Sequence, residues 1–155
     1  MQTEMMIQKP ILSDIALMCA LVEKEVQKGL ILPRSPEEMA NSIRSYCVAK
    51  LDGKIVGFCA LHIYSPSLAE VRSLVVGEPY RGQGIASALV SSVCQEGEAL
   101  GVKEFLVLTY RERLFKKLGF EVIEKSSLPD HKIWADCIKC KHFPICDEIA
   151  LLKKL

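Results

Sequence analysis

Hydrophobic side chains recur along this chain at two spacings, one typical of helices and one typical of strands. A first helix is predicted after Ser13, a favourable N-cap, and it is expected to end at Gly29. A second helix is predicted to open at Ser35, which is followed by a proline and two glutamates. A long amphipathic helix is predicted over about 84–100 and a short one over 113–118.

Strands are predicted between these helices. They are expected at residues 5–10, 46–51, 54–64, 68–76, 105–109, 120–125 and 149–155. Asp52 and Gly53 join two of them, which is a strong short-range signal for a β-hairpin. The order is an antiparallel run, then strands alternating with helices. It predicts an α/β (α+β) fold with a mixed, largely antiparallel sheet flanked by helices.

The composition is that of an ordinary globular protein. Half of the 155 residues are hydrophobic, which suits a single domain, 1–155, with its own core. The formal net charge of +1 argues against a nucleic-acid partner, because phosphate binding needs a basic surface. No apolar run reaches the length of a membrane span, and residues 1–9 lack the pattern of a signal peptide. We therefore expect a cytoplasmic protein with no membrane partner.

A glycine-containing segment lies between a predicted strand and the long helix; it reads Arg81, Gly82, Gln83, Gly84, Ile85, Ala86. Glycines let backbone N–H groups approach a ligand closely, and a helix N-terminus adds unpaired donors and partial positive charge. Arg81 adds a formal charge that pairs with phosphate oxygens. The segment predicts a pyrophosphate site, although it matches neither the dinucleotide fingerprint nor the nucleoside-triphosphate loop. A plain glycine turn is the alternative.

The same segment resembles motif A of the GNAT acetyltransferase superfamily, Arg/Gln-x-x-Gly-x-Gly/Ala, through Arg81, Gly84 and Ala86. Residues 74–80 are similar to the strand and Pro-aromatic exit that precede this motif, and residues 114–120 are similar to the second motif of the family. The resemblance implies the GNAT fold, in which two neighbouring strands splay apart around the cofactor.

The resemblance also implies acetyl-CoA as cosubstrate. Its pyrophosphate is expected on the backbone of Gly82, Gln83, Gly84, Ile85 and Ala86. Its pantetheine is expected along Leu74, Val75 and Val76. Phe115 is expected to line the cofactor site, at a position where many relatives carry a tyrosine that acts as an acid.

A narrower resemblance is to the acetyltransferase domain of N-acetylglutamate synthases, the amino-acid N-acetyltransferases of arginine biosynthesis. Residues 29–35 are similar to the Gly-Ile-Leu-x-Arg-Arg-Ser segment of that family, and residues 105–111 are similar to its Phe-Val-Leu-Thr-Thr-Arg strand. The resemblance implies acetyl transfer to the α-amine of L-glutamate, a small-molecule amino-acid partner, and it leaves a homodimer open. Two alternatives are kept: acetylation of another amine, and a non-catalytic module that binds acyl-CoA or metal.

The resemblance assigns roles to individual side chains. Glu70 is the expected base for the acceptor amine, and His62 is the alternative. A backbone N–H near Val75 is implied as the donor to the thioester oxygen. Thr109 matches a hydroxyl position of the synthases and is expected to face the leaving sulfur, with Tyr110 as its rival.

Glu70 lies on the strand predicted over 68–76. Strict alternation places Glu70, Leu74 and Val76 on one face of this strand, unless a β-bulge shifts the phase. A surface carboxylate paired with Arg72 is the simpler interpretation of Glu70.

Arginine is the side chain best suited to the carboxylates of a dicarboxylic acceptor. Arg34 matches a substrate-binding arginine of the synthases, and it stands near a predicted helix N-terminus, where the dipole disfavours a cation. Leu32 and Ser73 are also assigned to the acceptor. Lys139, or its neighbour Lys141, is the candidate for a second basic contact.

A Cys-rich C-terminal segment, 134–148, contains four candidate metal ligands. Cys137, Cys140, His142 and Cys146 have spacings that suit a structural zinc site. Reduced structural thiols and a redox pair are the alternatives. The other four cysteines stand singly among apolar residues and are predicted to be small core residues.

Overall fold

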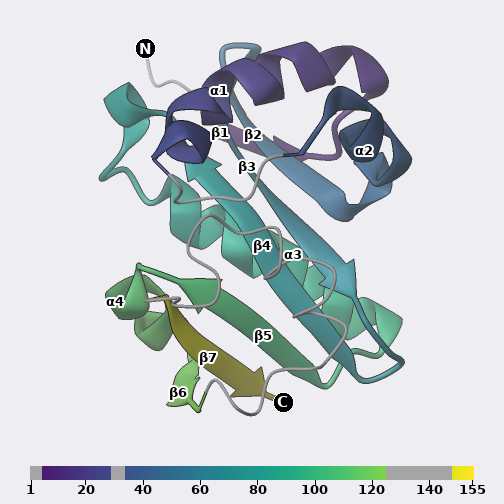
Figure 1. Cartoon of the computed structure of the whole chain (residues 1–155), viewed down its shortest axis with the longest axis vertical. Helices are drawn as coiled ribbons and strands as arrows, with labels where there is room; N and C mark the ends of the chain where they lie inside the picture. The colour runs from purple at the N-terminus through teal and green to yellow at the C-terminus, as the bar shows by residue number, and fades with distance from the viewer. Residues whose placement is uncertain (1–4, 29–33, 125–147) are drawn as a thin grey trace.

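The computed structural model of the chain describes residues 5–28, 34–124 and 148–155. Within them, seven strands form one sheet in the order β1-β2-β3-β4-β5-β7-β6 (Figure 1). The strands are β1 (Met5–Gln8), β2 (Tyr46–Leu51), β3 (Lys54–Ile63), β4 (Leu68–Val76), β5 (Glu104–Thr109), β6 (Glu121–Ile123) and β7 (Ile149–Lys154). Among these strands, only β4 and β5 are parallel neighbours. The predicted mixed, largely antiparallel sheet is confirmed.

Helices cover both faces of this sheet. They are α1 (Ile15–Gln27), α2 (Pro36–Asn41), α3 (Ile85–Leu100) and α4 (Glu112–Lys117), and 3₁₀ turns occupy Leu12–Asp14, Ile43–Ser45 and Glu78–Tyr80. Figure 1 shows α3 behind the sheet and α1 and α2 on its other side. Among the described helices, none combines the length and the apolar character that crossing a bilayer requires.

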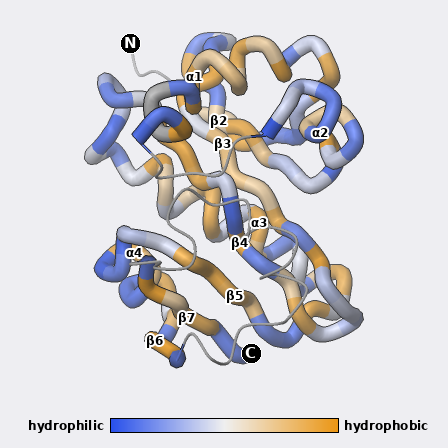
Figure 2. Tube along the Cα trace, viewed as in Figure 1, coloured by the Kyte–Doolittle hydropathy of each residue, from blue (hydrophilic) through white to orange (hydrophobic). Residues whose placement is uncertain are grey.

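Two apolar clusters hold these layers together. The larger lies between α3 and the sheet and contains Leu89, Val93 and Phe105. The smaller lies under α1 and α2 and contains Met18 and Phe58. Figure 2 shows that β5 is hydrophobic along most of its length, whereas β4 becomes hydrophilic near its middle. Because buried strands are normally apolar, the polar stretch of β4 is the part of the sheet that packing alone does not explain.

The start of α2 is confirmed in detail, whereas the start of α1 is not. Ser35 accepts a 3.1 Å hydrogen bond from the Glu38 N–H, and the Glu38 carboxylate accepts one from the Ser35 N–H at 3.4 Å. Ser13 was expected to cap α1, but it lies inside the 3₁₀ turn Leu12–Asp14. The buried carboxylate of Asp14 instead accepts the Ile11 N–H at 2.9 Å. Asp14 therefore binds back to the N-cap residue Ile11, which is the acidic half of a capping box and not the N-cap bond expected of Ser13.

A β-bulge divides β4 into two halves. Phe58 of β3 pairs with Val75, and Ala60 pairs with Arg72, so two residues of β4, Ser73 and Leu74, oppose one residue of β3. Ser73 has φ of 58°, a left-handed conformation that is uncommon outside glycine.

The bulge reverses the facing of the residues that follow it. Before it, Ala69 and Val71 pack on the α3 side; after it, Leu74 and Val76 do so. Glu70 therefore points to the opposite face from Leu74 and Val76. The expectation from strict alternation is wrong for this reason.

Candidate active site

Glu70 lies where β4 and β5 part. Parallel pairing joins Leu68 to Glu104, Ala69 to Phe105 and Glu70 to Leu106, and the recorded pairs end there. Beyond this point β5 stays paired with β7 up to Thr109, while β4 runs on to Val76 (Figure 1). Beyond Glu70, the backbone N–H and C=O groups of β4 on the side of β5 point into the space between the two separating strands. The expected binding of a pantetheine requires such groups.

The carboxylate of Glu70 is buried but has polar contacts. The residue is 1% exposed, and its Oε1 accepts a 2.6 Å hydrogen bond from the Tyr64 hydroxyl. The Arg72 Nη1 lies 3.7 Å from the same oxygen. The surface carboxylate considered from sequence is therefore ruled out, although the predicted pairing with Arg72 is present. A buried carboxylate held in one orientation is suited to act as a base.

His62 lies directly opposite Glu70 on β3. Its Nδ1 is 2.9 Å from the Arg72 Nη2. Arginine has no acceptor atom and stays charged, so Nδ1 must accept and the imidazole must be neutral with its proton on Nε2. Nδ1 is therefore engaged by Arg72, and this favours Glu70 over His62 as the base.

The glycine loop has the geometry of an anion site. Gly82 and Gly84 have φ of +81° and +80°, and a Cβ at either position would meet no atom within 4 Å. The first backbone bond of the 16-residue α3 runs from the Ala88 N–H to the Gly84 oxygen at 3.1 Å, so the preceding amides point out of the helix end. Arg81 is tied to β4 by a 3.0 Å bond from its Nε to the Val76 oxygen.

The other predicted cofactor residues divide into two kinds. Gln83 is exposed in the loop, and Leu74 is half-buried. The remaining side chains are core residues that can offer only backbone groups: Val75, Val76, Ile85 and Ala86. Phe115 is 1% exposed and packs edge-to-face on Phe120 at 5.3 Å. Its ring is thus part of the core, and its contact with the cofactor stays a prediction.

The end of β5 carries the two candidates for the leaving sulfur. Thr109 is 9% exposed, and its Oγ1 accepts a 2.9 Å hydrogen bond from the Arg111 N–H, whereas Tyr110 is 37% exposed. Burial and the neighbouring Arg81 guanidinium lower the pKa of Arg111. Arg111 is thus a basic group near the glycine loop that the sequence analysis did not single out.

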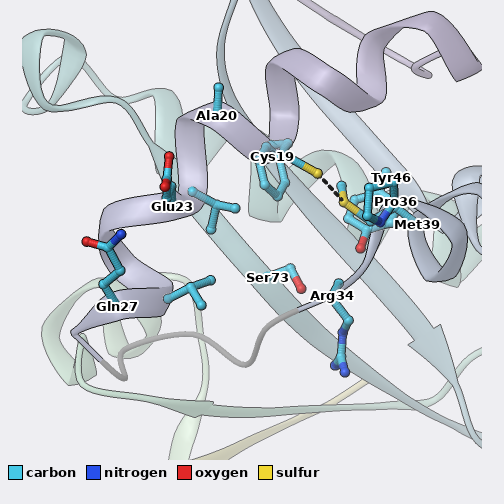
Figure 3. A pocket seen from close by; sticks show the side chains of 12 residues that line it. Cys19, Ala20, Glu23, Gln27, Arg34, Pro36, Met39, Tyr46 and Ser73 are labelled. Carbon is cyan, nitrogen blue, oxygen red and sulfur yellow. Dashed lines mark hydrogen bonds between the residues drawn. The ribbon is translucent and has the colours of Figure 1, made fainter.

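A pocket of about 380 Å³ lies between α1, α2 and the sheet (Figure 3). Its walls are mostly carbon and sulfur, from residues such as Val22, Val26, Met39 and Phe58. The predicted acceptor residues Arg34 and Ser73 both line it, and Figure 3 shows the Arg34 side chain extending away from the other labelled residues. The other two acceptor candidates, Leu32 and Lys139, lie outside the described residues.

Tyr46 also lines this pocket. Burial raises its pKa, while Arg34, Arg72 and a hydrogen bond with the Ser73 hydroxyl each act to lower it. Both arginines therefore act electrostatically on one phenol, which links the pocket to the polar stretch of β4.

The sequence model of the acetyltransferase (GNAT) family matches residues 18–120. The chain belongs to the GNAT acetyltransferase family. An uncharacterized N-acetyltransferase of Chlorobaculum tepidum is 39% identical over 144 residues, which cover 93% of this chain and 92% of the relative. An amino-acid acetyltransferase of Pasteurella multocida is 30% identical over 122 residues; these cover 77% of this chain and 28% of that relative.

The fold of this GNAT chain agrees with that of solved structures. The N-acetylglutamate synthase of Neisseria gonorrhoeae, complexed with coenzyme A and N-acetyl-glutamate, has a TM-score of 0.88 at 20% sequence identity. The likeness covers 100% of this chain and 36% of that chain. The predicted GNAT fold is therefore confirmed.

The zinc prediction concerns residues outside the described part of this acetyltransferase: Cys137, Cys140, His142 and Cys146. Within the described ranges, no three His, Cys, Asp or Glu side chains are placed to hold a metal ion. Cys47, Cys59 and Cys94 are buried, as predicted for core thiols. Cys19 is half-buried and lines the pocket between α1, α2 and the sheet, with its Sγ 3.5 Å from the Met39 sulfur (Figure 3).

Tyr46 and Tyr64 are site residues of this GNAT enzyme that the sequence analysis missed. Alternation along β3 and β4 places His62 and Tyr64 on the same face as Glu70 and Arg72, but only a known register shows that the two pairs meet. The available signal was the pattern of polar residues two apart on both strands of a predicted hairpin.

Proposed function

We propose that this acetyltransferase transfers the acetyl group of acetyl-CoA to the α-amino group of L-glutamate, by direct transfer in a ternary complex. The observation that carries the proposal is the position of Glu70. It is a buried, hydrogen-bonded carboxylate at the point where β4 and β5 diverge, on the sheet face that also carries the arginine-containing pocket.

Glu70 takes a proton from the acceptor ammonium, directly or through a water molecule. The freed amine then attacks the thioester carbonyl carbon, and the C–N bond forms as the C–S bond breaks. A backbone N–H near Val75 donates to the carbonyl oxygen as charge develops there. As the C–S bond breaks, the nitrogen loses its second proton, and the hydroxyl of Thr109 or Tyr110 relays a proton to the leaving thiolate, so that the hydroxyl itself ends protonated.

The cofactor is held by the loop that precedes α3. The amides of Gly82 to Ala86 bind the pyrophosphate, and the Arg81 guanidinium adds charge. Coenzyme A in the Neisseria synthase supports this assignment, since that protein shares the fold.

L-Glutamate is proposed as acceptor for two reasons. Arg34 lines the pocket, and a guanidinium there supports the binding of an acceptor carboxylate. The Pasteurella relative is an amino-acid acetyltransferase, and the Neisseria protein is complexed with N-acetyl-glutamate. The reaction would then open arginine biosynthesis in the cytoplasm.

A second candidate is another amino acid with an apolar side chain. The walls formed by Val22, Val26, Met39 and Phe58 favour it, because a charged group against them loses its hydration.

The test is a thiol-release assay with acetyl-CoA and a panel of amino acids and plain amines, with and without L-arginine. We expect the highest kcat/KM with L-glutamate. The Arg34→Ala variant should lose glutamate turnover while its affinity for coenzyme A stays within about twofold. Equal turnover of amines without a carboxylate would refute the proposal, and binding of acetyl-CoA with no turnover of any amine would indicate a non-catalytic module.

A further inference from the structure

The middle of β4 carries a second arginine on the acceptor side of the sheet. Arg72 lies two residues after Glu70, so both side chains leave the strand on the same face. Its side chain is 20% exposed, against 2% for that of Glu70. The guanidinium can thus be reached from solvent, whereas the carboxylate beside it is almost fully enclosed.

Two neighbours fix the direction of this guanidinium. Nη1 lies 3.7 Å from the Glu70 carboxylate, and Nη2 donates to the His62 Nδ1 at 2.9 Å. The His62 ring packs edge-to-face on Tyr64 with centroids 4.7 Å apart, and the Tyr64 hydroxyl donates to Glu70. These four side chains form a closed ring of contacts, which holds Arg72 in place before any ligand arrives.

Arg72 directly precedes Ser73, which lines the acceptor pocket. Arg34 and Arg72 both act on the phenol of Tyr46, which lines the pocket together with Arg34 and Ser73. Arg34 precedes Ser35, the N-cap of α2, and Arg72 lies on β4. Arg34 lines the pocket, whereas Arg72 lies beside the base, Glu70.

The geometry of an α-amino acid decides which guanidinium binds which group. The amine nitrogen and the carboxylate carbon are two bonds apart, about 2.5 Å. An amine that gives its proton to Glu70 therefore brings its α-carboxylate close to whichever cation is next to Glu70. That cation is Arg72, at 3.7 Å from Oε1. Arg34 is then left for a carboxylate at the end of the acceptor side chain.

We propose that Arg72 binds the α-carboxylate of the acceptor, so that the enzyme selects α-amino acids over plain amines at a residue of β4 next to its base. This inference rests on the proposed acetylation of an α-amino acid. His62 is a positioning residue in it, because its neutral imidazole orients the guanidinium without touching the acceptor.

The test compares two acceptors, L-glutamate and 4-aminobutyrate, which keeps the side-chain carboxylate but lacks the α-carboxylate. Wild-type enzyme should prefer L-glutamate. Arg72→Gln should lower kcat/KM for L-glutamate by roughly 10- to 100-fold and change that for 4-aminobutyrate by less than about threefold. Arg72→Lys keeps the charge without the two-pronged geometry and should fall between.

Arg34→Gln is the matched control. It should weaken the use of both acceptors, because both carry the side-chain carboxylate. Coenzyme A affinity, measured by calorimetry, should stay unchanged in all three variants and shows that they are folded. Equal losses on both acceptors in Arg72→Gln would overturn the proposal, since Arg72 would then act only through Glu70. A wild-type enzyme without preference between the two would overturn it as well.

Failure of the glutamate assignment can be told apart from failure of this inference. If the panel assay shows a different α-amino acid as acceptor, the same comparison is made with that amino acid and its decarboxylated amine. If Arg72→Gln loses the preference for the amino acid over its amine, the role of Arg72 is still supported. If the preference is unchanged, the role is overturned.

Discussion

Gly97 of α3 lies directly against the ring of Phe105 on β5: a Cβ on Gly97 would come within 2.6 Å of the Phe105 Cε1 and 3.1 Å of a Leu61 methyl. The helix and the sheet approach this closely because residue 97 has no side chain. Phe105 is 0% exposed and has no free space to move into.

Gly97→Ala should therefore destabilise the protein, although alanine is the better helix former. Forcing a methyl group against an aromatic ring costs about 1–3 kcal/mol, more than the gain in helix propensity of roughly 0.5–1 kcal/mol. Urea denaturation measures the difference. Ser91→Ala, at an exposed position of the same helix, is the control and should be neutral or slightly stabilising. A Gly97→Ala protein as stable as wild type would contradict the packing described.

Gly84→Ala should weaken coenzyme A binding by roughly tenfold or more, because the backbone at φ +80° would be strained within the loop proposed to bind the pyrophosphate. The hairpin residue Gly53 offers a matched control. It has φ of +78° and equally empty surroundings, so Gly53→Ala imposes the same strain far from the site. Calorimetry with coenzyme A should separate the two variants, while urea denaturation should find them alike. Equal affinities would remove the loop from the cofactor site.

Glu70→Gln should lower kcat by roughly 10²- to 10⁴-fold while coenzyme A binding is retained. The amide oxygen can still accept the Tyr64 hydroxyl, so the fold should survive the change. Glu121→Gln on β6 removes an exposed carboxylate away from the divergence and serves as the control. Steady-state thiol release gives the comparison. A kcat within threefold of wild type would exclude Glu70 as the base.

Cys94 should make the protein less stable in alkali. Burial raises the pKa of its thiol from 9.0 to about 11, with Lys153 lowering it and Glu98 raising it by smaller amounts. The raised value means that the unfolded chain ionises first. This contribution to stability is complete below pH 9 and is lost as the pH rises through about 11. Over that range the loss is on the order of 2–3 kcal/mol.

Denaturation of wild type and Cys94→Ala between pH 8 and pH 10.5 measures this contribution. The variant should lose less stability than wild type over that range. Because the buried Cys59 thiol also has a raised pKa, the difference between the two proteins is the informative quantity. Parallel pH profiles would show that Cys94 is not responsible.

Local signals in the sequence were sufficient for most of the architecture. Asp52 and Gly53 adopt φ of 50° and 78°, as the predicted hairpin turn requires, and Gly101 ends α3 in the left-handed conformation. Each of these positions is determined by the backbone preferences of one or two residues. Such preferences can be read from the sequence without knowing what lies nearby.

The parts of the site that were missed depend on contacts between strands. Ser73 has a positive φ although it is not a glycine, so its residue type does not predict the bulge. The contact of Arg72 with His62 follows from the register of β3 against β4, which alternation within each strand does not give. The bulge in turn decides which face Leu74 and Val76 occupy, because a single extra residue changes which side chains share a face.

The bulge at Ser73 also limits which insertions and deletions β4 can accept during evolution. Removing or adding one residue between Glu70 and Val76 would move Leu74 and Val76 from the α3 side of the sheet to the other face and send Val75 into their place. The strand can therefore accept exchanges of side chains but not changes in length. New acceptor preferences in descendants of this protein should arise by point substitution at positions such as Arg72, with the spacing to the cofactor loop held constant.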